Sequence, residues 1–196
     1  MKFIAHRINT IEELKSIPFE FGVELDVRDS GQDLIVVHNP FEDGILLDEY
    51  LKHYHHGTMI VNVKSERIEH RIIEMLNKYG IKDYFFLDSS IPMIYLLSNN
   101  GNKNNAIRFS ELEPIELAIA MKGRADWIWI DCFSQLPLNK DNYKVLKDMG
   151  YKLCLVSPEL QGQQEKLQMY KRYLSENNII LDAVCSKKYN YKEWME

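Results

Sequence analysis

Two acidic residues, Glu24 and Asp26, are separated by a single residue in the apolar segment 22–27. In an extended strand, alternate side chains point to the same face, so this segment would place the two carboxylates side by side. The carboxylates repel each other unless a cation lies between them, and oxygen ligands of this kind suit Mg²⁺ or Ca²⁺. The spacing therefore predicts a divalent-metal site. A carboxylate pair neutralised by nearby Arg and Lys side chains is the alternative that needs no metal.

Two histidines end apolar segments elsewhere in the N-terminal part of the chain: His6 closes residues 3–6, and His38 closes residues 34–38. Histidine accepts or donates a proton near neutral pH because its unperturbed pKa is ~6.5. Arg7 follows His6 directly, and a guanidinium binds phosphate oxygens through two parallel hydrogen bonds. Cleavage of a phosphodiester requires proton transfer to and from oxygen, together with positive charge beside the nonbridging oxygens. The combination therefore predicts phosphodiester chemistry.

Other residues with chemically versatile side chains are assigned to packing. Trp127 and Trp129 lie on one face of an apolar segment and could stack on a ligand, but tryptophan more often fills a core. The three cysteines, Cys132, Cys154 and Cys185, have neither metal-ligand spacing nor a neighbouring base. We therefore expect them to be buried, reduced thiols.

The length and composition predict a single domain over residues 1–196, because 45% of the residues are hydrophobic and 27% are charged. The formal net charge of -5, without basic clusters, argues against a nucleic-acid partner and against stable membrane association. The N-terminal apolar run is too short for a signal peptide, and no segment reaches transmembrane length. We therefore expect a cytoplasmic protein whose partner is a small molecule.

Short apolar segments alternate with segments of helical period, as expected for parallel strands joined by crossover helices. The expected strands are residues 3–6, 23–27, 59–64, 84–88, 106–110, 127–131, 152–157 and 182–187. The expected helices are residues 10–16, 65–79, 92–98, 114–122, 141–149 and 162–176. This α/β pattern predicts a compact (β/α)8 barrel of the TIM type with short helices. An open, doubly wound sheet is the alternative.

Polar residues gather at the C-terminal ends of the expected strands, including Asn62, Lys64, Asp88, Arg108 and Asp131. In a (β/α)8 barrel these ends form one mouth, which holds the active site. We therefore predict that Arg108 and Asp131 bind substrate. The simpler explanation for each residue taken singly is that strand ends are polar because loops begin there.

Five short motifs follow one another in the first third of the chain: Ala5-His6-Arg7, Asn9-Thr10, Gly22-Val23-Glu24-Leu25-Asp26-Val27, Val36-Val37-His38-Asn39 and Val61-Asn62-Val63-Lys64. In these motifs the chain resembles the glycerophosphodiester phosphodiesterases, and it is also similar to the related barrel of phosphatidylinositol-specific phospholipase C and sphingomyelinase D. The remaining two thirds match only in the rhythm of strands and helices.

The resemblance implies roles for specific residues. His6 and His38 would be the catalytic acid and base. A divalent metal, Mg²⁺ or Ca²⁺, would be bound by Glu24 and Asp26. The phosphate would be contacted by Arg7 and Lys64.

Three departures from the family pattern alter this expectation. Ile8 follows Arg7 where the family usually has glycine, and the segment before Asn9 is shortened. Asn62 stands where the family usually has an acidic metal ligand, so the third ligand would bring an amide oxygen without charge. The closing strand reads Cys-Ser-Lys-Lys over residues 185–188 in place of the family's usual Thr-Asp ending. We therefore expect weaker metal binding and a different substrate pocket.

Three functions fit the sequence. The favoured one is a phosphoric diester hydrolase that acts on a small soluble phosphodiester by two-histidine catalysis with a divalent metal. The second is a barrel that binds a phosphate ester and has lost catalysis. The third is a phospholipase-type lyase that forms a cyclic phosphate from a lipid headgroup.

Overall fold

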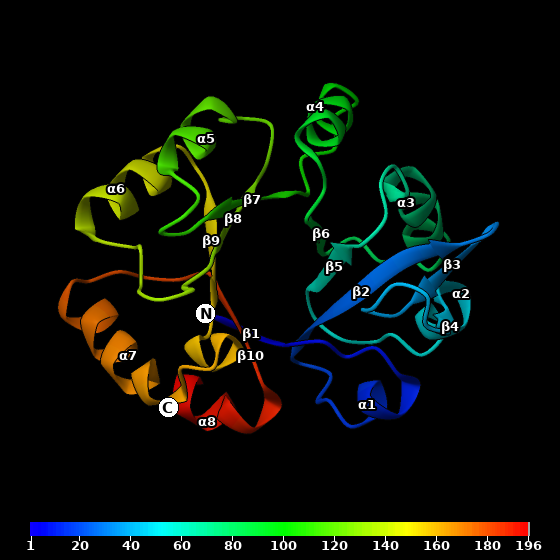
Figure 1. The fold of residues 1–196 in the computed structure, drawn as a ribbon, viewed down its shortest axis with the longest axis horizontal. Helices are drawn as coiled ribbons and strands as arrows, with labels where there is room; N and C mark the ends of the chain where they lie inside the picture. Colours follow the sequence, from blue (N-terminus) through cyan, green and yellow to red (C-terminus); the bar gives the residue numbers. More distant parts are fainter. Residues whose placement is uncertain (196) are drawn as a thin grey trace.

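Eight parallel strands form the centre of the molecule in a computed structural model that describes residues 1–195 (Figure 1). With one exception, each strand pairs in parallel with the next barrel strand along the chain, and the last strand returns to pair with the first. All eight expected strands are confirmed. They are β1 (Lys2–Ala5), β2 (Gly22–Ser30), β5 (Met59–Val63), β6 (Tyr84–Leu87), β7 (Ala106–Phe109), β8 (Trp127–Ile130), β9 (Lys152–Val156) and β10 (Ala183–Ser186).

The ring of strands is a barrel with one weak seam. Between β6 and β7 the described residues form no hydrogen-bonded ladder, and a single bridge joins Phe86 to Asn105. At this bridge the Phe86 N–H donates to the Asn104 carbonyl at 2.8 Å. The predicted (β/α)8 barrel fold is therefore confirmed, but its sheet is not closed by continuous pairing. The open, doubly wound alternative is wrong, because the barrel strands are arranged in chain order and the last strand pairs with the first.

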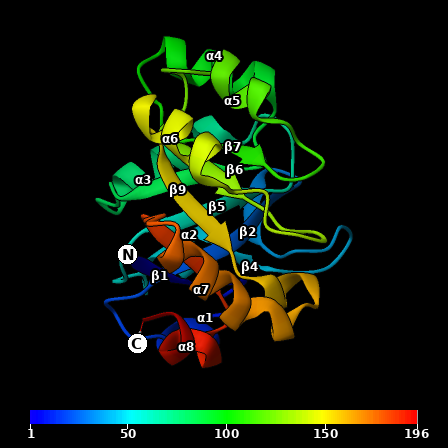
Figure 2. The same cartoon turned by 90° about the vertical axis from the view of Figure 1, so that its left-hand side faces the viewer.

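Short helices cover the outside of the strands, as Figure 2 shows for α6 and α7 in front of β9. Side-chain caps fix several helix starts: Thr10 forms a capping box with Glu13, and Ser90 and Asn139 accept backbone N–H groups. The crossover helices are α1 (Ile11–Lys15), α3 (Glu69–Lys78), α4 (Ile91–Asn99), α5 (Ile115–Ala120), α6 (Lys140–Asp148) and α7 (Leu167–Glu176). No helix among residues 1–195 is long and apolar enough to cross a membrane.

The predicted helix at 162–176 starts later than expected. Gly162 has a left-handed conformation (φ 72°) and ends the 3-10 helix η1 (Pro158–Gln161). A second 3-10 helix, η2 (Gln164–Lys166), then leads into α7. The glycine therefore terminates one element instead of starting the next.

A hairpin after the second barrel strand was not predicted. β2 continues past its apolar part through the polar residues 28–30, and there it pairs antiparallel with β3 (Asp33–Val36). Gly31, with a left-handed φ of 60°, allows the tight turn between the two strands. The hairpin brings the chain back toward the barrel just before His38. Further elements outside the prediction are β4 (Ile45–Leu46), α2 (Leu47–Leu51), the 3-10 helix η3 (Lys188–Asn190) and α8 (Tyr191–Met195).

The barrel interior is filled by a cluster separate from the larger core between strands and helices. Phe85 and Trp127 stack within this cluster, with ring centroids 4.5 Å apart and an interplanar angle of 21°. The packing assignment of the tryptophans and the buried free cysteines are confirmed. The interior cluster consists of Ile4, Ile60, Phe85, Leu87, Ala106, Trp127, Trp129, Cys154, Val156, Ala183 and Cys185.

We expect Phe85→Ala to lower the free energy of unfolding by about 3–5 kcal/mol, because the ring is fully buried in a closed interior that collapses poorly. Phe41→Ala is the control, because Phe41 is fully exposed and its loss should change stability by no more than about 0.5 kcal/mol. Urea unfolding followed by circular dichroism measures both. Equal costs for the two variants would contradict the packed interior.

Candidate active site

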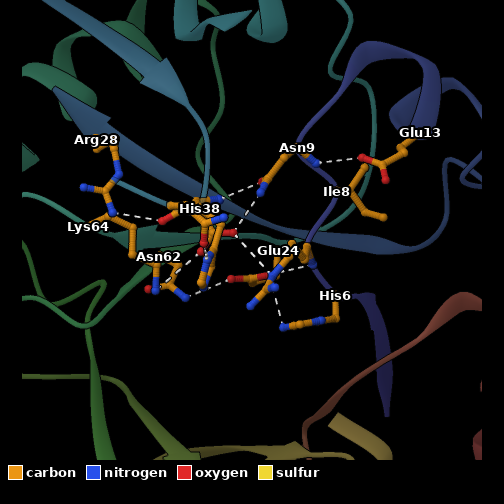
Figure 3. Close-up of polar contacts among 12 residues, drawn as sticks. His6, Ile8, Asn9, Glu13, Glu24, Arg28, His38, Asn62 and Lys64 are labelled. Carbon is orange, nitrogen blue, oxygen red and sulfur yellow. Dashed lines mark hydrogen bonds and ion pairs between the residues drawn. The ribbon is translucent and has the colours of Figure 1, made fainter. Parts of the chain in front are cut away.

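The pairing of β2 with β5 brings the predicted metal ligands together. In this register Asp26 lies opposite Asn62, and Glu24 lies two residues before Asp26 on the same face. The Glu24 and Asp26 side chains are each 1% exposed, and the Asn62 Nδ2 group donates to Glu24 Oε1 at 3.0 Å (Figure 3). The three side chains therefore form one buried polar group at the C-terminal ends of adjacent strands.

The loop after β1 supplies further hydrogen bonds to the two carboxylates. Arg7 adopts a left-handed conformation (φ 52°), and its backbone N–H donates to Glu24 Oε2 at 2.6 Å. Asn9 makes two bonds to one residue: its Nδ2 donates to Asp26 Oδ2 at 2.8 Å, and its Oδ1 accepts from the Asp26 N–H at 2.9 Å. Sequence reasoning did not assign Asn9 to the site. Two signals pointed to it: its place directly before the helix cap Thr10, and the Asn9-Thr10 motif among those that resemble the phosphodiesterase family.

Burial and mutual repulsion make the carboxylate pair hard to ionise fully. Burial and the neighbouring Asp26 raise the pKa of Glu24 to about 7, although the bonds from Asn62 and from the Arg7 N–H favour its charged form. A bound cation would reverse this effect, because it favours the charged form of both carboxylates. The pair therefore carries less than its full charge at neutral pH when no cation is bound.

Two oxygens of this group have no hydrogen-bond partner among the described residues. They are Asp26 Oδ1 and Asn62 Oδ1, and both are buried. Carboxylate and amide oxygens are ligands of Mg²⁺ and Ca²⁺. Over residues 1–195 no three His, Cys, Asp or Glu side chains are arranged to hold a metal, but the predicted set has two carboxylates and one amide. The chemistry of the unpartnered oxygens fits a hard divalent cation. The Lys64 ammonium, 3.4 Å from Asp26 Oδ1, partly neutralises the carboxylate.

His6 lies beside the acidic pair, with its Nε2 atom 3.9 Å from Glu24 Oε2. Its pKa is lowered to about 3, mainly because the ring is buried. The positive charges of Lys187 and Arg7 lower the pKa further. The ring is therefore neutral at physiological pH, so its contact with Glu24 is not an ion pair. Its Nδ1 atom is buried without a partner in the described chain.

His38 lies in the loop that follows β3. Its Nδ1 atom is 2.8 Å from Asn39 Oδ1, and its backbone carbonyl accepts a bond from Arg28 Nη2 at 2.9 Å. These contacts orient the ring and anchor the loop. His38 lies in the same cluster as His6 and Glu24 (Figure 3), and a charge on His38 is among the influences that lower the pKa of His6.

A row of alternating charges continues around the mouth from the acidic pair. Lys64 Nζ lies 3.7 Å from Asp88 Oδ2, and Asp88 Oδ1 accepts from Arg108 Nε at 2.6 Å. Arg108 Nη1 in turn donates to Asp131 Oδ2 at 3.0 Å. The structure therefore brings the two predicted substrate-binding residues, Arg108 and Asp131, into the same mouth, where they bind each other. Their contact with substrate stays a prediction.

A cavity of about 600 Å³ opens beside His38 and Arg7. It lies between the start of α1 and the loop after β3. Its lining includes Arg7, Asn9, His38 and Glu42. The cavity therefore gives a ligand access to the Arg7 and His38 side chains.

Two solved structures are similar to this chain along almost its whole length. A glycerophosphodiester phosphodiesterase from Agrobacterium tumefaciens str. C58 superposes with a TM-score of 0.68 at 16% identity, covering 95% of this chain and 97% of that one. A second structure from the same organism, described as a glycerophosphoryl diester phosphodiesterase, has a TM-score of 0.67 at 11% identity and covers 94% and 92%. No family model and no curated protein matches the sequence. The likeness establishes a shared fold.

The raised pKa of Glu24 predicts a pH-dependent effect of Glu24→Gln on the metal-free protein. The contribution of protonated Glu24 to stability is complete below its unfolded pKa of about 4.5 and is lost as the pH rises through about 7. The variant should therefore gain stability relative to wild type between pH 5 and pH 8, by on the order of 1 kcal/mol. Urea unfolding in chelator at both pH values measures the difference.

Glu20→Gln is the matched control, because Glu20 is exposed and precedes the N-terminal end of β2. Its effect should be the same at both pH values. A Glu24→Gln effect that does not change between pH 5 and pH 8 would contradict the buried, mutually repelling pair.

Proposed function

We propose that this protein is a phosphodiesterase that hydrolyses a small soluble phosphodiester, with glycerophosphodiesters as the first substrate class to test. The observation that carries the proposal is the gathering of His6, His38, Arg7 and Lys64 around the buried Glu24–Asp26 pair. The fold shared with two glycerophosphodiester phosphodiesterase structures supports it. The motifs in the first third of the chain that resemble this family also support the proposal.

The two histidines are assigned to proton transfer. One ring accepts a proton from the attacking oxygen, and the other donates a proton to the leaving oxygen. His6 has a fixed position beside Glu24, and His38 is oriented by Asn39 on the cavity side. The attacking group is water for hydrolysis. A neighbouring hydroxyl of the substrate would instead give a cyclic phosphate.

The cationic side chains are assigned to the phosphate. Arg7 Nε lies 3.9 Å from Asp26 Oδ2 and its side chain is 46% exposed, so the guanidinium can turn toward a ligand. The Lys64 side chain is more deeply buried than that of Arg7, and its ammonium lies 3.4 Å from Asp26 Oδ1. Glu24, Asp26 and Asn62 would hold a Mg²⁺ or Ca²⁺ ion, which when bound supplies positive charge to a nonbridging oxygen. Arg7 and Lys64 fix the orientation of the phosphate in the mouth.

Two observations favour a second candidate function, a barrel that binds a phosphate ester without turning it over. Asn62 brings no charge to the metal ligands, and Lys64 already lies against Asp26. Both features weaken metal binding relative to three carboxylates. Stoichiometric binding of a phosphate ester without any product is the result expected for this candidate.

We expect His6→Ala and His38→Ala each to lower the turnover rate by roughly 10²- to 10⁴-fold, because each removes a proton-transfer group. Phosphorus NMR on a panel of phosphodiesters, with Mg²⁺, with Ca²⁺ and with chelator, measures turnover and separates a monoester product from a cyclic phosphate. His70→Ala is the control, because His70 is exposed on α3 and lines a separate cavity with residues 100–104. Rates within a few-fold of wild type in either histidine variant would remove that residue from the mechanism.

The metal assignment predicts opposite effects from two substitutions. Mg²⁺ or Ca²⁺ should raise the unfolding temperature of the wild type, because a ligand that binds only the folded state stabilises it. Asn62→Asp should enlarge this shift by adding a third carboxylate, whereas Asp26→Asn should abolish it. Without metal, Asn62→Asp should lower the unfolding temperature, because the bond to Glu24 is lost and a charge is added beside it. Equal metal-induced shifts in all three proteins would contradict the assigned ligands.

A further inference from the structure

Lys187 is a cation at the mouth to which sequence reasoning assigned no role. It follows β10, which pairs with β1 in the register Ala5 to Ser186, and the His6 N–H donates to the Ser186 carbonyl at 2.9 Å. The backbone of Lys187 is still extended (φ -70°, ψ 141°), so the alternation of the strand continues to this residue. Cys185 lies in the barrel interior. The Lys187 side chain therefore starts on the interior side, next to His6.

The backbone of Lys187 is held firmly in place. Its N–H donates to Glu159 Oε1 at 3.0 Å, and its carbonyl accepts from the Asn190 N–H at 2.9 Å. The same Glu159 oxygen accepts the Ser186 hydroxyl at 2.5 Å. The Glu159 carboxylate is therefore occupied by a backbone N–H and by hydroxyl groups.

Lys187 differs from the other cations of the mouth in having no anionic partner. Lys64 lies within 3.7 Å of the Asp26 and Asp88 carboxylates. Arg108 shares Asp88 with Lys64 and also binds Asp131. The Arg7 guanidinium is 3.9 Å from Asp26. Within residues 1–195 the Lys187 ammonium forms no ion pair and no side-chain hydrogen bond, although the residue is half-buried. An ammonium in this environment gains more from an incoming anion than one whose charge is already neutralised.

We propose that Lys187 is a substrate-binding residue whose ammonium contacts a nonbridging phosphate oxygen on the His6 side of the mouth. This inference rests on the proposed function. It extends the phosphate contacts beyond Arg7 and Lys64 to a third cation from the opposite end of the chain. A lysine here also offsets the charge that increases on the nonbridging oxygens during the reaction.

The test compares the affinity of four proteins for inorganic phosphate, measured by isothermal titration calorimetry in chelator and again with Mg²⁺. Lys187→Met keeps the length of the side chain and removes its charge, and Lys187→Arg keeps the charge. Lys188→Met is the matched control, because the neighbouring Lys188 is exposed and donates to the Ser16 carbonyl outside the mouth. Circular dichroism melting of each variant checks its fold.

We expect Lys187→Met to raise the phosphate dissociation constant by about 10- to 100-fold, the usual effect of losing one charged hydrogen bond. Lys187→Arg should stay within a few-fold of wild type, and Lys188→Met should bind as wild type does. A folded Lys187→Met protein with unchanged phosphate affinity overturns the inference. A wild type that binds no phosphate under either condition also overturns it.

Turnover of a phosphodiester by wild type and Lys187→Met separates this inference from the proposed function. If the wild type turns over a diester and Lys187→Met has the same kcat and KM, the enzyme assignment stands and the role of Lys187 is wrong. If Lys187→Met loses phosphate affinity but the wild type turns over no diester, Lys187 is an anion-binding residue of a binding protein.

Discussion

The burial of two adjacent carboxylates, Glu24 and Asp26, is the electrostatic constraint that organises the mouth of this barrel. A buried charge without compensation costs several kcal/mol, and repulsion within the pair adds to that cost. Hydrogen bonds from three groups offset part of this cost: the Arg7 N–H and the Asn62 amide donate to Glu24, and the Asn9 amide donates to Asp26. The left-handed turn at Arg7 therefore has an electrostatic purpose, because it directs a backbone donor at a carboxylate.

The alternating charges beyond the pair coincide with the weak seam of the sheet. Asp88 follows β6 and Arg108 lies on β7, and their 2.6 Å hydrogen bond joins the C-terminal ends of the two strands that lack a ladder. Asp88 reaches this position from a left-handed conformation (φ 65°). Because the two side chains are partly buried, the pair is screened less by solvent than a fully exposed ion pair would be. The same row of charges thus holds the rim together and separates Lys64 from Arg108 by a carboxylate.

The barrel interior is divided along its axis into an apolar zone and a polar mouth. Alternate residues of one strand contribute to both: Ile60 packs in the interior cluster, whereas Asn62 and Lys64 belong to the mouth. The apolar floor excludes water beneath the charged groups, which strengthens their interactions with one another and with an anionic ligand. On the far side of the ring, Cys185 and Lys187 repeat this division. The chemistry of the site therefore gathers at one end because every strand changes from apolar to polar in the same direction.

The sequence alone determined the eight barrel strands, because each is a short apolar run and most are separated by segments of helical period. It also determined that Glu24 and Asp26 share one face of a strand, because side chains alternate between the two faces. Periodicity could not reveal the β2–β3 hairpin, since its outer part is polar, nor the open seam at Phe86, since pairing depends on the neighbouring strand. Only the tertiary structure showed that Asn9 binds Asp26 and that the ammonium of Lys187 has no partner within residues 1–195. Contacts of this kind join residues far apart in the chain, so they are set by strand register and loop geometry, which local patterns do not encode.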